Sequence, residues 1–210
     1  RFKYDLPGHY IKGYRVYRSK TGEMKLLADG LDVHRSGRLQ SCVSFEDPTG
    51  GFRAELQETE DAVIGHPITG REVSRETEIL QKDSWELCLC QEDLVPRIHI
   101  PSDGSFDQET VEASYVRARE IFDRCYPDYP YKAFFCQSWL MSPDLQKVMK
   151  PTSNILAFQN KFVQVPCASS GRLVFSFVFG MDAAIPENLG ALPETTSLQR
   201  AIKALYLNGG

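Results

Sequence analysis

The sequence of 210 residues predicts an α+β protein in which a mixed, mostly antiparallel β-sheet is flanked by helices. Two observations predict this fold class. Short strand patterns separated by turn residues fill roughly the first hundred residues, and the pattern then changes to strand, helix, strand, helix. The apolar and charged fractions, 42% and 25%, are those of an ordinary globular protein that is long enough to bury a core.

The expected strands of the first part end at turn residues. They cover Tyr10–Tyr17, Met24–Ala28, Leu31–Leu39, Cys42–Phe45, Phe52–Val63, Glu76–Gln81, Trp85–Cys90 and Leu94–Ile100. The charges of Phe52–Val63 also suit a helix, but the glycines at both of its ends favour a strand. A boundary is expected near Gly65, which divides a β-rich N-terminal segment, residues 1–64, from an α/β domain, residues 65–210.

The stretch from Val95 to Pro127 is the centre of the predicted domain. A run with β-branched residues stops at Pro101 and the turn-rich segment 102–105, and a helical pattern then begins. Ser105 or Asp107 is the expected N-cap of this helix. After it we expect a strand from Lys132, a short helix that opens at Ser142–Pro143, and a helix at Ser153–Phe162. A strand at Arg172–Gly180 (RLVFSFVFG) and a last helix ending at Tyr206 are expected to follow.

Composition argues against several classes of partner. The formal net charge is −4 and no Lys/Arg cluster stands out, so we expect no nucleic-acid partner. No apolar run approaches the ~20 residues of a membrane span, and no signal peptide is visible. Six cysteines without framework spacing indicate a reduced, cytoplasmic protein. Cys88, Cys90 and His99 are the best candidates for metal ligands, but they lack a fourth ligand and the usual spacing, so no metal is expected.

No phosphate-binding loop, dinucleotide fingerprint, nucleophile elbow or zinc-protease motif is present. Polar residues gather around the central strand, helix and second strand instead. His99 is a candidate general base. Since it alternates with Ile98 and Ile100, it either points to the opposite face or is a satisfied core histidine. The serines of the loop and of the helix starts have an alternative explanation as turn or cap residues, as does Asn154. Trp139 has an alternative explanation as a core residue.

A resemblance adds to this interpretation. The chain resembles the C-terminal GNAT-like domain of a bacterial acyltransferase-domain family, well over residues 65–162 and loosely over the first sixty. Its most specific pieces are I-H-I-P from Ile98, C-x-S-W-L from Cys136, and S-N-I from Ser153. The resemblance implies a GNAT-like fold, in which two parallel strands, here Val95–Ile100 and Lys132–Leu140, splay apart around the pantetheine of acetyl-CoA or another acyl-CoA.

The resemblance also implies roles for residues of this chain. The activity would be acyl-CoA-dependent N-acyl transfer to a small amine-bearing substrate. The helix from about Asp107 would offer its N-terminus to the pyrophosphate. The implied site residues are His99 as general base, Ser102, Gly104 and Ser105 as cofactor contacts, and Ser138, Trp139 and Asn154 on the substrate side.

The loop departs from the family's pattern of Gln/Arg-x-x-Gly-x-Gly/Ala, since one glycine and no basic residue remain at 101–107. Asp103, Asp107 and Glu109 would oppose a pyrophosphate. Three functions therefore stay open. The first is an acyltransferase, and the second is a catalytically degenerate GNAT-like fold that binds a small molecule. The third is a scaffolding domain whose first sixty residues pair with a missing upstream segment or with a second copy in a homodimer. An exposed strand edge at Tyr10–Tyr17 would favour the third.

Overall fold

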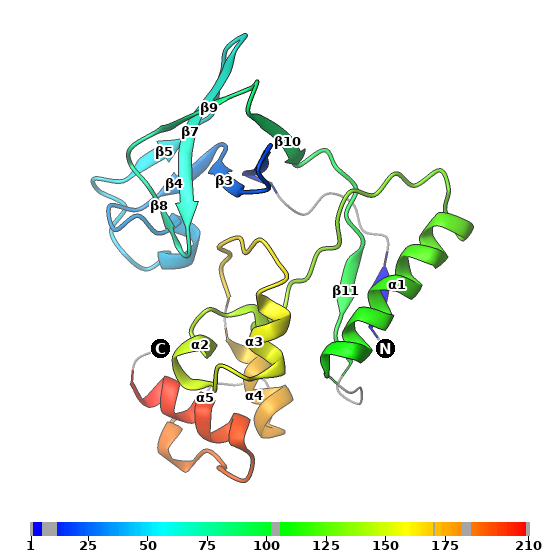
Figure 1. Ribbon diagram of the computed structural model, residues 1–210. Coiled ribbons are helices and arrows are strands. Elements are labelled where there is room, and N and C mark those ends of the chain that lie inside the picture. Colours follow the sequence, from blue (N-terminus) through cyan, green and yellow to red (C-terminus); the bar gives the residue numbers. More distant parts are fainter. Residues whose placement is uncertain (1, 6–11, 102–105, 170, 182–185, 209–210) are drawn as a thin grey trace.

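The computed structural model describes residues 2–5, 12–101, 106–169, 171–181 and 186–208 (Figure 1). The α+β prediction is confirmed, because antiparallel strands are combined with five α-helices in the described part of the chain. Figure 1 shows three neighbouring parts: a strand-rich part, a unit of β1, β11 and α1, and a group of helices α2 to α5.

The strand-rich part is built on a curled antiparallel sheet with the order β10-β2-β3-β7-β6, to which β8 and β9 add by pairing with β7. Its strands are β2 (Tyr14–Ser19), β3 (Met24–Ala28), β6 (Gln57–Glu58), β7 (Ala62–Thr69), β8 (Glu72–Val73), β9 (Glu78–Gln81) and β10 (Trp85–Leu89). Leu27 and Leu80 are almost completely buried on the side of the sheet that packs around Tyr17 and Val63. The strand-rich part therefore has a hydrophobic core of its own.

The predicted free edge is not an edge in the described residues. Strand β2, which contains the described end of Tyr10–Tyr17, pairs with β10 on one side and with β3 on the other. Its backbone groups are therefore not available to a further strand, and the observation that would favour a scaffolding domain is missing there.

A smaller sheet joins β4 (Leu31–Val33) to β5 (Phe52–Ala54). The preference for strand over helix at Phe52–Val63 is confirmed, although the segment is divided among β5, β6 and the start of β7. The strand expected at Cys42–Phe45 is wrong: Gln40–Val43 forms a short 3₁₀ helix, η1, whose Val43 is buried. A single turn buries this apolar residue without a partner strand.

The expected boundary between residues 64 and 65 falls inside strand β7. Residues Ala62–Gly65 of this strand pair with β9, and its later residues pair with β3 and β8. Backbone hydrogen bonds thus join both sides of the boundary in one sheet. The division into two domains stays a prediction, and any boundary of this kind has to preserve β7.

The C-terminal third is helical and has its own apolar core. Its elements are η2 (Trp139–Met141), α2 (Leu145–Val148), α3 (Asn154–Gln159), α4 (Arg172–Phe179), η3 (Leu189–Ala191) and α5 (Ser197–Leu207). Buried Leu145, Phe175 and Ile202 are part of this core. Thr196 and Gln199 form a capping box at the start of α5, in which each side chain bonds the other residue's backbone N–H.

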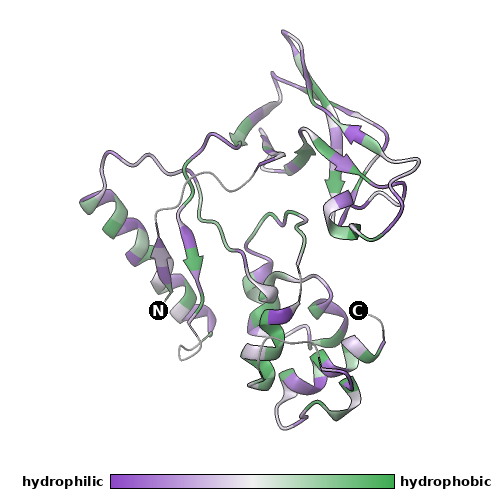
Figure 2. Ribbon diagram, turned by 180° about the vertical axis from the view of Figure 1, so that it is seen from behind, coloured by the Kyte–Doolittle hydropathy of each residue, from purple (hydrophilic) through white to green (hydrophobic). Residues whose placement is uncertain are grey.

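The strand expected at Arg172–Gly180 is wrong, because these residues form α4. Gly171 and Gly180 flank the helix with positive φ angles of 69° and 64°, a conformation that glycine adopts without strain. The helix buries Phe175 on one face and leaves Phe177 exposed on the other. The continuous apolar run is thus a helix with both buried and exposed apolar residues. Figure 2, coloured by hydropathy, shows hydrophobic residues along the helices of this group.

In the described residues, none of the helices combines the length and the apolar character that crossing a membrane requires.

Candidate functional site

The predicted pair of parallel segments is present, in shorter form. Strand β11 (Arg97–His99) lies beside residues 131–135, with parallel bridges at both ends of the contact. The N–H of Ile98 donates to the carbonyl of Phe135 at 2.7 Å, and the N–H of Phe135 donates to the carbonyl of Pro96 at 2.9 Å. The full strand expected at Lys132–Leu140 is wrong, because the chain leaves the pairing and turns into η2 at Trp139.

The hydrogen bonding between the two segments ends at this contact. Beyond Ile98 and Phe135, the described residues show no further backbone hydrogen bond between them. Cys136 and Gln137 make no backbone hydrogen bond to another described residue. His99 directly follows Ile98 and so lies at the end of the parallel contact, where the resemblance implies that the segments splay apart.

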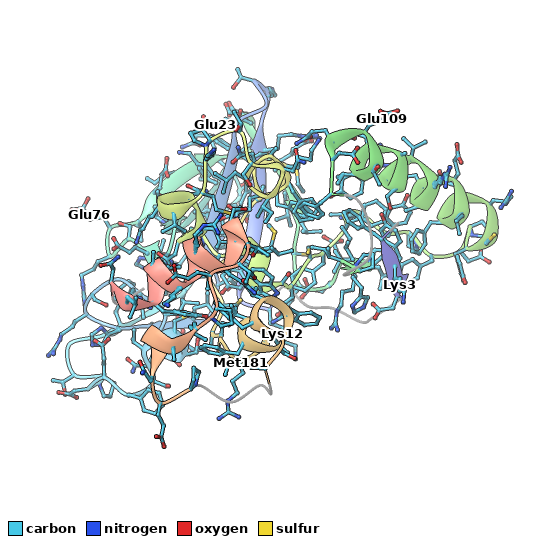
Figure 3. All side chains as sticks on the ribbon, turned by 90° about the horizontal axis from the view of Figure 1, so that it is seen from below. Lys3, Lys12, Glu23, Glu76, Glu109 and Met181 are labelled. Atoms are coloured by element: carbon cyan, nitrogen blue, oxygen red, sulfur yellow. The ribbon has the colours of Figure 1, made fainter. Side chains whose placement is uncertain are left out.

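Helix α1 (Gln108–Cys125) connects the two segments, and its expected N-cap is confirmed. The carboxylate of Asp107 accepts hydrogen bonds from the backbone N–H and from the hydroxyl of Thr110, both at 2.8 Å. Glu109 follows in the first turn and extends from the outer surface of the helix (Figure 3). The positive end of this helix dipole therefore already faces two carboxylates.

The inner face of α1 holds strand β1 (Lys3–Asp5), which pairs antiparallel with β11. The hydroxyl of buried Ser114 accepts a hydrogen bond from the N–H of Phe2 at 3.2 Å and lies 3.2 Å from the hydroxyl of Tyr4. The ring of Tyr4 packs edge-on against Phe122. Ser114, a mid-helix serine in the sequence, thus anchors a strand more than a hundred residues away.

His99 points away from α1. Its neighbour Ile98 is buried, whereas the side chain of His99 is 47% exposed. The Nε2 atom lies 2.7 Å from Oδ2 of Asp5. Sequence reasoning missed Asp5, because no local pattern signals the pairing of β1 with a strand 94 positions later. The alternation of His99 with Ile98 and Ile100 left two alternatives open, and the exposed side chain agrees with the one in which it points to the opposite face.

The cofactor contacts expected at Ser102, Gly104 and Ser105 lie outside the described residues, as does Asp103. The described chain resumes at Phe106, whose ring packs against Phe158 of α3. Helix α3 is thereby tied to the start of α1 and to the end of the loop.

The three residues expected on the substrate side have structural partners of their own. The hydroxyl of Ser138 accepts a hydrogen bond from the N–H of Leu140 at 3.2 Å and so caps η2. Trp139 packs against the apolar core of the helical group. Asn154 is the exposed first residue of α3, and the cap itself is Ser153. Among the described residues, no hydrogen bond or ring contact joins them to His99.

Two further polar groups lie near each other, the hydroxyl of Tyr115 on α1 and the thiol of Cys136 in the return segment. The hydroxyl of Tyr115 is buried without a hydrogen-bond partner among the described residues, and burial raises the pKa of this phenol. Burial also raises the pKa of the Cys136 thiol to about 12. A thiol with such a pKa stays protonated at neutral pH, so Cys136 is not an activated nucleophile.

The described residues contain no group of three or more His, Cys, Asp or Glu side chains that is arranged to hold a metal ion. Cys88 lies on β10 and its Sγ is 3.8 Å from the carbonyl of Glu86, whereas His99 is engaged with Asp5.

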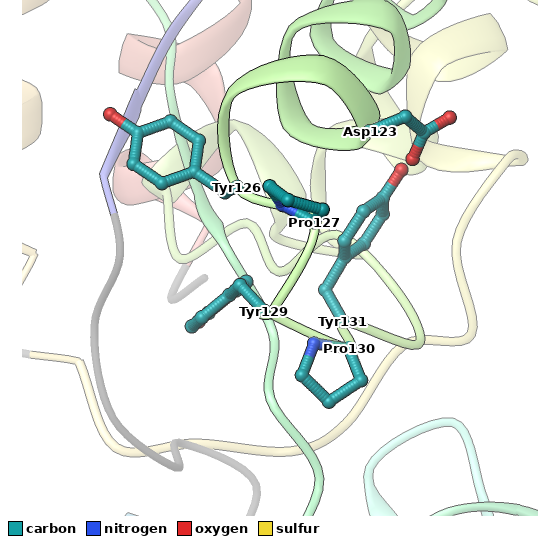
Figure 4. Close-up of a pocket in the computed structure, with 6 residues that line it drawn as sticks. All are labelled: Asp123, Tyr126, Pro127, Tyr129, Pro130 and Tyr131. Atoms are coloured by element: carbon teal, nitrogen blue, oxygen red, sulfur yellow. The ribbon is translucent and has the colours of Figure 1, made fainter.

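A shallow cavity of about 300 Å³ lies at the other end of α1 (Figure 4). It is lined by Asp123, Tyr126, Pro127, Tyr129, Pro130 and Tyr131. Tyr131 forms a parallel β-bridge with Leu94. Leu94 precedes His99 by five positions, which corresponds to a distance of about 16 Å along an extended chain. The cavity is therefore separate from the splay of the parallel segments.

The described elements define a class of protein. A strand, a loop, a helix capped at its N-terminus and a parallel return segment form an α+β unit of the GNAT-like type. A family model described as the GNAT-like C-terminal domain matches residues 33–210, and the chain belongs to this family. No curated protein sequence matches the chain.

Several solved structures are similar to this chain. An acyltransferase in complex with decanoyl-CoA shares 22% identity over 73% of this chain and 42% of its own, with a TM-score of 0.49. An acyltransferase in complex with decanoyl-CoA and teicoplanin shares 23% identity over 73% and 43%, with the same TM-score. The chain thus spans less than half the length of these acyltransferases.

Proposed function

We propose that the protein is an acyl-CoA-dependent N-acyltransferase that acts on a small amine-bearing substrate. The observation that carries the proposal is the end of the parallel pairing at Ile98 and Phe135 in a member of the GNAT-like family. Acyl-CoA would supply an activated thioester. Pantetheine contains peptide-like amides, and the backbone of Cys136 and Gln137, which is unpaired among the described residues, offers matching hydrogen-bonding groups.

His99 is the proposed general base. It directly follows the last hydrogen-bonded residue of the parallel contact, its side chain is accessible, and a neutral imidazole has a nitrogen that can accept a proton. Ser102, Gly104 and Ser105 remain the proposed cofactor contacts. Trp139, Ser138 and Asn154 remain proposals for the substrate side, and their structural partners give each of them a second explanation.

The start of α1 favours a second candidate function, a catalytically degenerate domain that binds a small molecule. The Asp107 carboxylate occupies the N–H of Thr110, and Glu109 adds a second negative charge in the same turn. Both disfavour a pyrophosphate at this helix terminus. A ligand without phosphate would not meet this repulsion.

A thermal-shift titration separates the two functions. The panel is acetyl-CoA, decanoyl-CoA, CoA, desulfo-CoA and pantetheine, and a ligand that binds only the folded state stabilises it by about 2.7 kcal/mol at a hundred times its Kd. Saturable stabilisation by the CoA compounds supports the acyltransferase. Stabilisation by none of them at millimolar concentration contradicts it, and stabilisation by pantetheine alone favours the degenerate domain.

The variant Asp107→Ser tests the role of the acidic helix start. Serine retains an N-cap oxygen but removes the charge. Tighter CoA binding by this variant, with unchanged pantetheine binding, would show that the carboxylate opposes the pyrophosphate. The matched control is Asp123→Ser near the other end of the same helix, which should leave CoA binding unchanged.

A cytoplasmic location is also proposed, since all six cysteines are free, as in a reducing compartment. A homodimer stays a prediction.

A further inference from the structure

Asp5 and His99 form a diagonal pair across strands β1 and β11. Lys3 lies directly opposite His99, and Asp5 lies directly opposite Arg97. The side chains of Asp5 and His99 are therefore on the same face of the two strands, in diagonal positions. Oδ2 of Asp5 is 2.7 Å from Nε2 of His99. Both side chains are about half exposed, 50% and 47%, so the imidazole remains accessible while one of its nitrogens is held.

The chemistry of the two groups fixes where the proton is. An ionised carboxylate only accepts hydrogen bonds, so the nitrogen beside it, Nε2, carries the proton. Nδ1 of the neutral ring is then the basic nitrogen, and no described residue is hydrogen-bonded to it. The carboxylate also stabilises the imidazolium that forms when Nδ1 accepts a proton.

We propose that Asp5 is a positioning residue for acyl transfer, which orients the imidazole of His99 and keeps Nδ1 free to act as the base. This inference rests on the proposed function. It assigns a role to a residue outside the range 33–210 that the family model matches. The site would then be completed by a strand that joins β11 from the far N-terminal end of the described chain.

The nitrogen of a neutral amine attacks the thioester carbonyl carbon, a C–N bond forms, and the C–S bond breaks with the electron pair on sulfur. The proton lost by the amine nitrogen passes to Nδ1 of His99 and then to the departing thiolate. Asp5 remains ionised and exchanges no proton, so its contribution is orientation and stabilisation of the transient charge.

A purely structural role for Asp5 is the competing explanation. Strand β1 has other anchors: its backbone pairs with β11, Ser114 bonds Phe2, and the ring of Tyr4 packs on Phe122 and Phe134. An ion pair that is about half exposed adds little to stability. Loss of the Asp5 carboxylate should therefore leave β1 in place, and its effect on turnover is separable from folding.

The test compares Asp5→Asn with Asp32→Asn in the full chain. Asp32 is a matched control, because its carboxylate also pairs across two antiparallel strands, with Arg53 at 2.8 Å, and is exposed. Release of CoA from decanoyl-CoA is measured by chromatography, with water and with a panel of primary amines as acceptors. Water uses the same base, so the assay does not depend on knowing the acceptor.

We expect Asp5→Asn to lower kcat about tenfold with little change in the KM for decanoyl-CoA, and Asp32→Asn to change neither. In a His99→Gln background, Asp5→Asn should have no further effect, because a residue that acts through the imidazole has nothing left to orient. Asp5→Glu should recover part of the loss, since it restores the carboxylate.

Three results would overturn the inference. An Asp5→Asn enzyme with the turnover of Asp32→Asn leaves the proposed function intact and removes the role of Asp5. A loss that persists in the His99→Gln background shows that Asp5 acts independently of His99. A wild-type protein that neither binds nor turns over acyl-CoA refutes the proposed function itself, and the role of Asp5 with it.

Discussion

Gln159 holds η2 against α3, and its removal gives the sharpest stability prediction. The side chain is completely buried at the end of α3, and its amide donates to the carbonyls of Leu140 at 2.7 Å and Ser142 at 3.0 Å. In Gln159→Met the volume is nearly conserved, so no large cavity forms. The carbonyl of Ser142 keeps its bond from the N–H of Leu145, whereas that of Leu140 loses its partner.

The expected cost follows from this difference. The lost bond to Ser142 costs about 1 kcal/mol, and leaving the part-buried carbonyl of Leu140 without a partner costs about 1–3 kcal/mol. We expect Gln159→Met to lower the free energy of unfolding by about 2–4 kcal/mol. Urea denaturation followed by circular dichroism measures it.

The control is Gln146→Met. Gln146 is exposed, and its amide reaches Oε1 of Gln159 only at 3.4 Å, so its replacement should change stability by less than about 0.5 kcal/mol. If Gln159→Met were as stable as this control, the two bonds to η2 would not hold the segment that carries Trp139, and the reasoning would be refuted.

Two more predictions test the helical group and its pH dependence. Phe175→Ala should lower the free energy of unfolding in urea by about 3–5 kcal/mol, and Phe177→Ala by less than about 0.5 kcal/mol, because the two residues are 3% and 65% exposed. Similar losses would contradict the helix and indicate a strand, in which both side chains lie on one face. Burial opposes ionisation of Asp144, but hydrogen bonds from Lys147 and Arg71 lower its pKa. This stabilisation is complete above about pH 4 and lost below it, so the unfolding free energies of wild type and Asp144→Asn should converge as pH falls towards 2; a constant difference would contradict it.

Helix α1 and the ends of its flanking segments could be predicted because the signals for them lie within a few residues of each other in the sequence. The Asp107 cap and the helical spacing that follows it gave α1, and the prolines marked the ends of its flanking segments. The parallel order of β11 and the return segment was instead implied by the family resemblance. It overestimated their length, since nothing in Lys132–Leu140 distinguishes an extended chain from a hydrogen-bonded strand.

The run Arg172–Gly180 shows where local signals are ambiguous. A continuous apolar segment is compatible with a covered strand or with a helix, and periodicity alone does not separate them. The glycines at both ends were the usable signal, since Gly180 occupies the left-handed position that commonly follows a helix. The exposure of Phe177 could not be predicted, because it depends on which helices pack against the other face.

The candidate site was only half predictable, for a physical reason. His99 was accessible to sequence reasoning through its neighbours Ile98 and Ile100, whereas Asp5 reaches it through a pairing between distant strands. That pairing depends on the inner face of α1, where Ser114 binds β1. A fragment that starts at residue 65 would retain β11 and α1 but lose β1. It would therefore keep the proposed base and lose the carboxylate that is proposed to orient it, and under this proposal the functional unit extends across a boundary near residue 65.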